Sequence, residues 1–334
     1  MHEAEYYTVP GNQYVQCNLC PANCRLKPGQ TGTCHVRRNI NGKLYALTYG
    51  LIAALHTDPI EKKPLYHYYP GKVVLSAGTA GCNLHCTFCQ NWDISQRSPD
   101  ELPVQHLSPE ELIEQARTVP GNLGIAYTYN EPAIWFEYVR DTAILAHRYG
   151  LKNILVSNGY INEAPLQELL PLIDAINIDL KAFDDHFYRK YTGAKFQPVL
   201  NTLQWLKKFR IHTEITILVI PGLNDDPDRF GKMCSWISDK LGHETVLHIS
   251  RYYPAWKMKI PPTPPETLKE LYRIAKNILD YVYVGNIELP EGHDTTCPKC
   301  GKIVIHRSGY YTDTTGLDEK GNCADCHHHI FDYL

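Results

Sequence analysis

The residues most able to do chemistry in this sequence are its cysteines. The chain of 334 residues contains 12 of them, and all but Cys234 fall into three tight groups. The groups are Cys17, Cys20, Cys24 and Cys34; then Cys82, Cys86 and Cys89; then Cys297, Cys300, Cys323 and Cys326. Because the start of the chain has no export signal, thiols that would be kept reduced in the cytosol favour metal binding over disulfides. We interpret Cys234 as an ordinary buried thiol.

The middle group has the spacing C-x3-C-x2-C and follows directly on a predicted strand. Three thiolates on a tight loop can hold three irons of a cubane 4Fe-4S cluster and leave the fourth iron open for an exchangeable ligand. Alternatively, a distant thiol such as Cys34 completes a closed zinc or cluster site. The spacing by itself leaves both alternatives open.

The C-terminal group consists of two C-x2-C pairs separated by 22 residues. Two such knuckles beside short β-rich runs predict a zinc ribbon, because four thiolates suit tetrahedral zinc. A rubredoxin-like iron site is the alternative, since the same geometry holds either metal. We interpret the adjoining residues 327–329, all histidine, as surface residues.

The N-terminal group has the spacing C-x2-C-x3-C-x9-C and also offers four thiols. A structural zinc is the first interpretation, and an auxiliary iron-sulfur cluster is its rival. The rival would relay electrons to a catalytic cluster or bind substrate at a second metal. Spacing does not separate the two.

The elements that must position these groups alternate short β-rich runs with helical patterns, which is typical of a parallel sheet built from βαβ units. The predicted strands are Lys72–Ser76, Leu123–Tyr129, Asn153–Ser157, Ala175–Asp179, His212–Ile220, Thr245–Tyr252 and Tyr281–Val284. One predicted helix begins at a capping box formed by Ser108 and Glu111. Two further helices are predicted over Ala133–Tyr149 and Thr267–Leu279.

This pattern predicts an α/β fold, a partial β/α TIM-like barrel over residues 72–290, where chemistry gathers at the carboxyl ends of the strands. Residues 1–71 are expected to form an N-terminal four-cysteine module with its lead-in. Residues 291–334 are expected to form the zinc-ribbon-like module.

Composition narrows the function classes. Hydrophobic residues make up 43% and charged residues 21% of the chain, as in globular proteins. The net charge of −3 argues against nucleic acid and anionic membranes as partners. No apolar run is long enough to span a membrane, so a cytoplasmic protein is expected.

Several motifs at the ends of the predicted strands resemble those of the radical S-adenosylmethionine (SAM) superfamily. These motifs are the C-x3-C-x2-C loop, which contains Phe88, and the segments that contain Glu131, Asn158, Asp179, Lys181 and His248. The aspartate-x-lysine pair matches the pyruvate formate-lyase activating enzyme group. The match departs from the family's glycine-glycine-glutamate motif, because Tyr129 and Asn130 stand where the glycines would be.

The resemblance implies that Cys82, Cys86 and Cys89 hold a 4Fe-4S cluster whose open iron is chelated by SAM. It places Phe88 near the adenine and Asn158 near the ribose. Glu131 is implied to contact the methionine amino group of SAM. The Asp179–Lys181 motif and His248 are implied to bind its carboxylate. Reductive cleavage of SAM would then give a 5′-deoxyadenosyl radical that abstracts hydrogen from a substrate, which makes the chain an oxidoreductase.

A closer resemblance is to the AmmeMemoRadiSam system radical SAM enzyme. It is carried by Asp58–His67, Cys89–Asn91, Val219–Asp225 and Tyr283–Asn286. The implied partners are a low-potential electron donor of flavodoxin or ferredoxin type and Memo-like and AMMECR-type proteins.

The substrate stays open at this point. An activase would act on a glycyl residue of a partner protein, whereas another enzyme of the superfamily would modify a small molecule or peptide. A non-enzymatic zinc-ribbon binding protein is the third alternative. Several side chains near strand ends are not assigned a catalytic role, because such residues usually pack: Tyr127, Tyr129, Arg251, Tyr252 and Tyr253.

Overall fold

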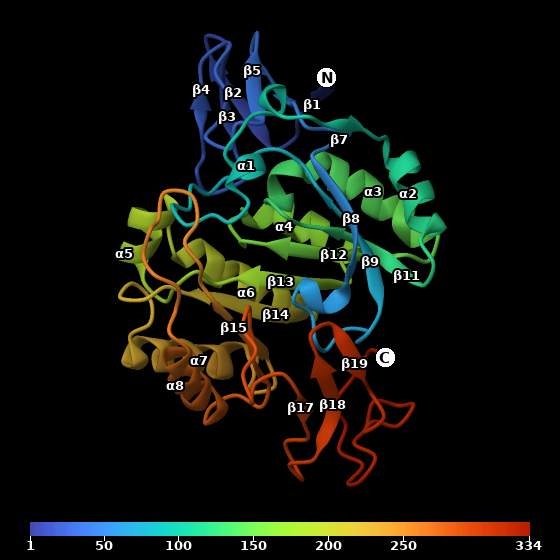
Figure 1. The fold of residues 1–334 in the computed structure, drawn as a ribbon. Helices are drawn as coiled ribbons and strands as arrows, with labels where there is room; N and C mark the ends of the chain where they lie inside the picture. Colours follow the sequence, from blue (N-terminus) through green and yellow to red (C-terminus); the bar gives the residue numbers. More distant parts are fainter.

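The computed structural model describes residues 1–334, and an eight-stranded sheet forms its centre (Figure 1). The strand order is β16-β15-β14-β13-β12-β11-β9-β8. The strands are β8 (Ala54–Pro59), β9 (Val73–Gly78), β11 (Asn122–Tyr127), β12 (Lys152–Ser157), β13 (Ala175–Asp179), β14 (His212–Val219), β15 (Val246–Arg251) and β16 (Val282–Gly285). Neighbours run parallel except β8, which is antiparallel to β9. Because β8 and β16 are the two ends and do not pair, the barrel is partial, as the sequence predicted.

Helices follow the parallel strands and pack on the outer face of the sheet. They are α1 (Trp92–Ser95), α2 (Pro109–Thr118), α3 (Phe136–Arg148), α4 (Glu163–Leu169), α5 (Asp185–Phe187), α6 (Gln197–Phe209), α7 (Pro227–Leu241) and α8 (Pro265–Lys276). The capping box expected at Ser108 is present, with its hydroxyl accepting from Glu111 N at 3.2 Å. Cys234 lies fully buried on α7, in the main hydrophobic core.

The two faces of the sheet belong to different cores, as the alternation of side chains along a strand requires. On β13, Ile176 and Ile178 join the main core beneath the helices. Ala175 faces the interior of the partial barrel, in a separate cluster with Ile60 and Tyr68 of the lead-in segment, residues 60–71. Ile60 N donates to Lys72 O, just before β9 begins, so the lead-in segment closes the barrel at the amino ends of the strands.

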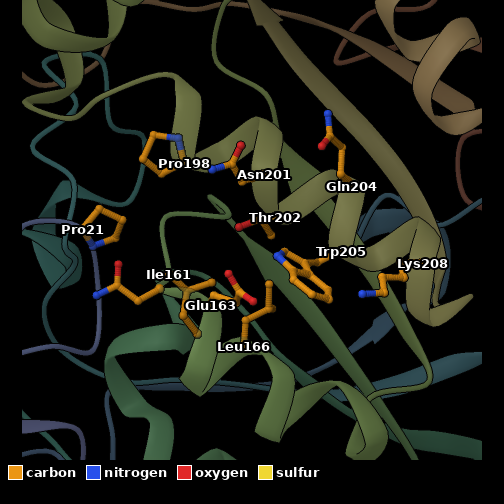
Figure 2. Close-up of a pocket in the computed structure, with 11 residues that line it drawn as sticks. Pro21, Ile161, Glu163, Leu166, Pro198, Asn201, Thr202, Gln204, Trp205 and Lys208 are labelled. Carbon is orange, nitrogen blue, oxygen red and sulfur yellow. The ribbon is translucent and has the colours of Figure 1, made fainter.

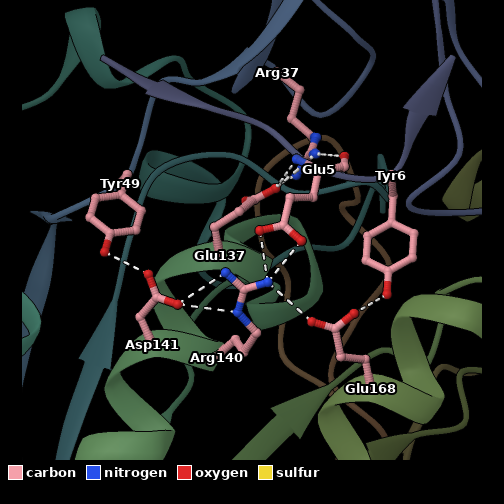
Figure 3. A network of polar contacts seen from close by, with 8 residues as sticks. All are labelled: Glu5, Tyr6, Arg37, Tyr49, Glu137, Arg140, Asp141 and Glu168. Atoms are coloured by element: carbon pink, nitrogen blue, oxygen red, sulfur yellow. Dashed lines mark hydrogen bonds and ion pairs between the residues drawn. The ribbon is translucent and has the colours of Figure 1, made fainter.

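The N-terminal module contains two small sheets, β2-β3-β4 and β1-β6-β5. Their strands are β1 (His2–Glu3), β2 (Tyr7–Gly11), β3 (Tyr14–Cys17), β4 (Arg25–Leu26), β5 (Arg37–Ile40) and β6 (Lys43–Ala46), and β7 (Leu51–Ile52) pairs with β10 (Gln105–His106). A polar network fixes the module to α3 (Figure 3). In it, Arg37 pairs with Glu137 at 2.9 Å and Arg140 pairs with Glu5 at 2.7 Å.

The C-terminal module is a three-stranded sheet of β17 (Thr295–Thr296), β18 (Ile303–Ser308) and β19 (Tyr311–Asp313). It docks on the lead-in segment: Arg307 donates to Tyr66 O at 2.9 Å, and Thr312 donates to Glu61 at 2.9 Å. The two cysteine modules therefore lie at opposite ends of the sheet (Figure 1).

The seven predicted strands correspond to β9 and β11–β16, within two residues at each end. The predicted helix at Ala133–Tyr149 begins as a 3-10 turn, Pro132–Trp135, before α3. The sheet extends beyond the predicted barrel region, since β8 lies within residues 1–71.

Candidate active site at the strand ends

The three-cysteine loop lies between β9 and α1, at the carboxyl end of the first parallel strand. Its backbone is held from a distance. His85 N donates to Thr192 O at 2.7 Å, and Thr87 N donates to Tyr191 O at 2.9 Å. From within the loop's own region, the Gln96 side chain donates to Leu84 O at 3.1 Å. These contacts fix the backbone between the three cysteines, as a preorganised metal site requires.

Gly81 lets the loop approach the N-terminal module closely. Its φ is +83°, and a Cβ at this position would meet Cys34 O at 2.3 Å and the Val36 side chain at 2.5 Å. Only glycine accepts both conditions without strain or displacement. The backbone beside Cys82 therefore packs directly on the loop that contains Cys34.

The thiols of the loop fit a cluster better than a single ion. Burial raises the pKa of the Cys86 thiol to about 12 and raises the pKa of Cys82 well above its usual value. Bound iron removes such protons by coordinating the thiolate. The C-terminal group is the only set of three or more potential ligands in the chain whose atoms all lie within 4.8 Å of one another. The three sulfurs of this loop therefore do not all lie within 4.8 Å of one another, which agrees with three ligands that each bind a different iron of a cubane.

Glu131 and Asn158 come from the next two strand ends and meet beside Cys82. Ser157 Oγ donates to Glu131 Oε1 at 2.8 Å, and Asn158 N donates to Glu131 Oε2 at 2.7 Å. The Asn158 amide lies 3.6 Å from Cys82 Sγ. Burial raises the pKa of Glu131 to about 7, although these hydrogen bonds favour its charged form.

Asp179 and Lys181 come from the end of β13. Lys181 Nζ pairs with Asp179 Oδ2 at 2.7 Å, and both charges lie close enough to Cys86 to affect its ionisation. Burial by itself would lower the pKa of Lys181, but the Asp179 carboxylate holds that pKa above its usual value. The ammonium therefore stays charged at the strand ends. Glu131, Asn158, Asp179 and Lys181 are thus brought to the same end of the sheet as the cysteine loop.

Phe88 and His248 have other surroundings. Phe88 is buried in the main core, with its ring centroid 5.8 Å from that of Phe187. His248 Nε2 lies 2.6 Å from Glu214 Oε2, and its ring stacks on that of Tyr283. Glu214 binds the lead-in segment, so the hydrogen bond of His248 points toward the closed end of the barrel. The roles of Phe88 and His248 toward SAM stay predictions.

One charged cluster at the barrel was not predicted as part of the site. Asp58 of β8 accepts from Lys63 at 2.6 Å, from Lys62 at 2.8 Å and from the Tyr129 hydroxyl at 2.6 Å. Burial would raise the pKa of Asp58, but these three hydrogen bonds hold that pKa well below its usual range. Tyr129 adopts a φ of +71°, a conformation that favours glycine and that the family's motif fills with glycine. Two signals in the sequence bear on this cluster: that departure from the motif, and the stretch Asp58–His67, which carries the closer family resemblance and contains Asp58, Lys62 and Lys63.

A cleft lined by two helices lies elsewhere (Figure 2). It has a volume of about 630 Å³ and is bounded by Pro21 of the N-terminal module and by side chains of α4 and α6 that include Trp205. Its lining contains none of the cysteines, so it is separate from the site described above.

The four C-terminal cysteines form a compact group that could bind zinc. Cys297 and Cys326 have their sulfurs 3.5 Å apart, and Cys300 and Cys323 have theirs 3.7 Å apart. Four thiolates about 2.3 Å from one zinc ion would stand about 3.8 Å from one another. All 12 cysteines are free of disulfides. No helix has the combination of length and apolarity needed to cross a membrane.

Comparison with known proteins agrees with this geometry. Residues 77–234 match the model of the radical SAM superfamily. The chain is 43% identical to an uncharacterized protein of Methanocaldococcus jannaschii over 98% of both chains. It is 24% identical to the pyruvate formate-lyase 1-activating enzyme of Escherichia coli K12, over 54% of this chain and 74% of that protein. Its fold resembles that of a radical SAM methyltransferase from Sphaerobacter thermophilus, with a TM-score of 0.51 at 14% identity, over 65% of this chain and 67% of the other. The chain belongs to the radical SAM superfamily.

Proposed function

We propose that this chain is a radical SAM enzyme of the AmmeMemoRadiSam type, an oxidoreductase that cleaves SAM reductively. The observation that carries the proposal is the convergence of the cysteine loop, Glu131, Asn158, Asp179 and Lys181 at the carboxyl ends of successive parallel strands. In β/α barrels this is the edge where ligands are bound and transformed.

Each residue has a proposed task. When bound, a 4Fe-4S cluster with SAM supplies the 5′-deoxyadenosyl radical chemistry. Cys82, Cys86 and Cys89 hold three irons as thiolates. Glu131 accepts from the methionine ammonium, and Lys181, oriented by Asp179, pairs with the methionine carboxylate.

The remaining groups shape the site. Asn158 contacts the ribose and Phe88 borders the adenine, whereas the hydrogen bond of His248 to Glu214 does not favour the predicted contact of His248 with the carboxylate. Because Lys181 and Asp179 are partly buried, the attraction between the Lys181 ammonium and a bound carboxylate is stronger than it would be in water. The buried walls exclude water that would divert a radical.

For the substrate, we propose a glycyl residue of a partner protein. The curated relatives that support this include the E. coli activating enzyme and the (2S)-3-sulfopropanediol dehydratase activating enzyme of Klebsiella oxytoca, 28% identical over 141 residues. Because β8 and β16 do not pair, the barrel is not closed by backbone hydrogen bonds at this side, and this is where we propose that a loop of the partner approaches. Memo-like and AMMECR-type proteins are the proposed partners, and a flavodoxin or ferredoxin is the proposed electron donor. Twelve unpaired thiols support a reducing, cytoplasmic setting.

The first experiment tests cleavage of SAM. The protein is reconstituted without oxygen and given dithionite and SAM, and 5′-deoxyadenosine is measured by chromatography. We expect product from the wild type and from the control Cys234→Ala, which removes a buried thiol of α7, and none from Cys86→Ala. A wild-type sample with a verified cluster and no product would instead support the non-enzymatic binding protein.

The second experiment tests the substrate. Purified Memo-like and AMMECR-type proteins are added in turn to the reduced enzyme with SAM. Formation of a glycyl radical, seen by electron paramagnetic resonance, would support the activase. If SAM is cleaved but neither protein acquires a radical, modification of a small molecule or peptide becomes the better account.

A further inference from the structure

The four N-terminal cysteines face a common enclosed void. It is lined by all four of them together with Arg37 and apolar side chains of the module and of the turn before α3. Cys17, Cys20 and Cys34 are buried, and Cys24 is partly buried. The thiols come from the end of β3 and from the segments before and after β4, and their convergence on one void indicates a ligand between them, because cysteines that serve only for packing have no reason to converge.

The spacing of the sulfurs argues against a single ion. A lone zinc holds its four sulfurs about 3.8 Å apart, which is the geometry of the C-terminal group. The four C-terminal sulfurs all lie within 4.8 Å of one another, whereas no three of the N-terminal sulfurs do. The three sulfurs of the three-cysteine loop do not lie this close together either. The N-terminal sulfurs therefore resemble those of Cys82, Cys86 and Cys89, the proposed cluster ligands, and differ from the compact C-terminal group.

Arg37 adds an independent sign of an anionic, sulfur-rich ligand. Its terminal nitrogens are used by Glu137 and by Glu5 O (Figure 3). Its Nε has no hydrogen-bond partner in the protein, and water does not reach it because the residue is only 1% exposed. A buried donor left unpaired costs about 1–3 kcal/mol. A thiolate or sulfide acceptor in the adjoining void would satisfy it, as hydrogen bonds to sulfur do around iron-sulfur clusters.

We propose that Cys17, Cys20, Cys24 and Cys34 bind a second 4Fe-4S cluster, with a cysteine on every iron. Because no iron is left open, this cluster does not take SAM. The contact between Cys34 O and Gly81 sets its ligand loop against the residue that precedes Cys82. The two clusters therefore sit in adjoining loops. The inference concerns metal content and does not rest on the cleavage of SAM.

The test removes the catalytic cluster and counts what remains. The full-length variant Cys82→Ala, Cys86→Ala, Cys89→Ala is purified without oxygen, and its iron, acid-labile sulfide and zinc are measured per chain. We expect about four irons and about four sulfides, the content of one cubane, together with about one zinc ion. About two zinc ions and no iron would overturn the proposal in favour of a structural zinc.

Two further variants in that background assign the iron to the N-terminal group. Cys24→Ala, the least buried of the four, is expected to lose the iron and keep the zinc. The matched control Cys234→Ala is expected to keep both. If Cys24→Ala retains its iron with an unchanged cluster spectrum, the proposed ligand set is wrong. Should that variant fail to fold, as judged by circular dichroism, the metal count of the parent variant still decides between cluster and zinc.

Discussion

Glu131 holds a carboxylate where solvent does not reach it, and its three hydrogen-bond donors are fixed by the backbone and by Ser157. Burying the negative charge of a carboxylate costs free energy unless a cation pairs with it. Among the predicted site residues it is the one whose environment most clearly anticipates a ligand. Its SAM contact can be tested by removing the charge alone.

We expect Glu131→Gln to weaken SAM binding about tenfold or more, because a hydrogen bond to a charged group contributes about 1.5–3 kcal/mol. The affinity is measured by equilibrium dialysis on cluster-loaded protein. Glu163→Gln, on the exposed start of α4, serves as the control and is expected to bind SAM as the wild type does. Equal affinities for the wild type and Glu131→Gln would remove Glu131 from the SAM site.

The pH dependence of binding follows from the raised pKa of Glu131. With a pKa of about 7, the carboxyl of the free protein is largely protonated at pH 6 and largely charged at pH 8. Only the charged form pairs with an ammonium, so the affinity for SAM should fall about tenfold from pH 8 to pH 6. Glu131→Gln has no such proton to lose, and its affinity should be flat over that range. A wild-type affinity that rises toward pH 6 would contradict this sign.

At the scale of elements, the lead-in segment depends on one buried carboxylate of β14. Glu214 is fully buried and accepts from the backbone of Tyr66 at 2.9 Å and His67 at 2.7 Å, and lies 3.0 Å from His212 Nε2. Burial would raise the pKa of Glu214, but its two histidine partners hold that pKa well below its usual value. The carboxylate thus ties residues far apart in sequence into the floor of the barrel.

Glu214→Gln should destabilise the fold by about 3 kcal/mol, because it breaks a buried charged network and turns an amide donor toward existing donors. The thermal midpoint would fall by several degrees. Glu266→Gln, which breaks an exposed pair with Lys269, should change the stability by less than about 0.5 kcal/mol.

Acid adds a second readout for the same carboxylate. Because the folded pKa of Glu214 is depressed, its stabilisation is present above the unfolded pKa of about 4.3 and is lost as the pH falls below that value. The wild type should therefore lose thermal stability toward pH 3.5 more steeply than Glu214→Gln does. Parallel losses in the two proteins would argue that Glu214 is not the group responsible.

Local pattern predicted most of the elements, and tertiary contacts account for what it missed. The strands that became β9 and β11–β16 were found because their apolar runs alternate with helical segments. β8 was missed because Ala54–Pro59 is mostly exposed or half-buried and ends in Asp58 and Pro59. The site residues in motifs were found at the strand ends, but the contact of Tyr129 with Asp58 joins residues 71 apart and has no local signal.

At the scale of the whole molecule, the two cysteine modules serve different ends of the sheet. The C-terminal module is hydrogen-bonded to the lead-in segment, and no hydrogen bond links it to the three-cysteine loop. It therefore cannot cap the strand ends. The N-terminal module, in contrast, touches that loop at Gly81.

Loss of the zinc ion that the C-terminal group could bind should lower the stability of the fold and leave the iron content unchanged. Cys323→Ala removes one of four thiolates and is expected to release about one zinc ion per chain. Its visible spectrum after anaerobic reconstitution should match that of the wild type, whereas its thermal midpoint should fall because the lead-in segment loses its support. A loss of iron in Cys323→Ala would show that the ends of the sheet are coupled.

The network that holds the N-terminal module has a consequence for the order of biosynthesis. Arg37 pairs with a residue 100 positions later, and the backbone of Asn18 accepts from Asn162, 144 positions later. The N-terminal module therefore needs α3 and the turn before α4 before it can complete its contacts. The four thiols of the module are then enclosed only after α3 and β12 have been made, and a chain that ends before about residue 165 would leave those thiols exposed to oxidation.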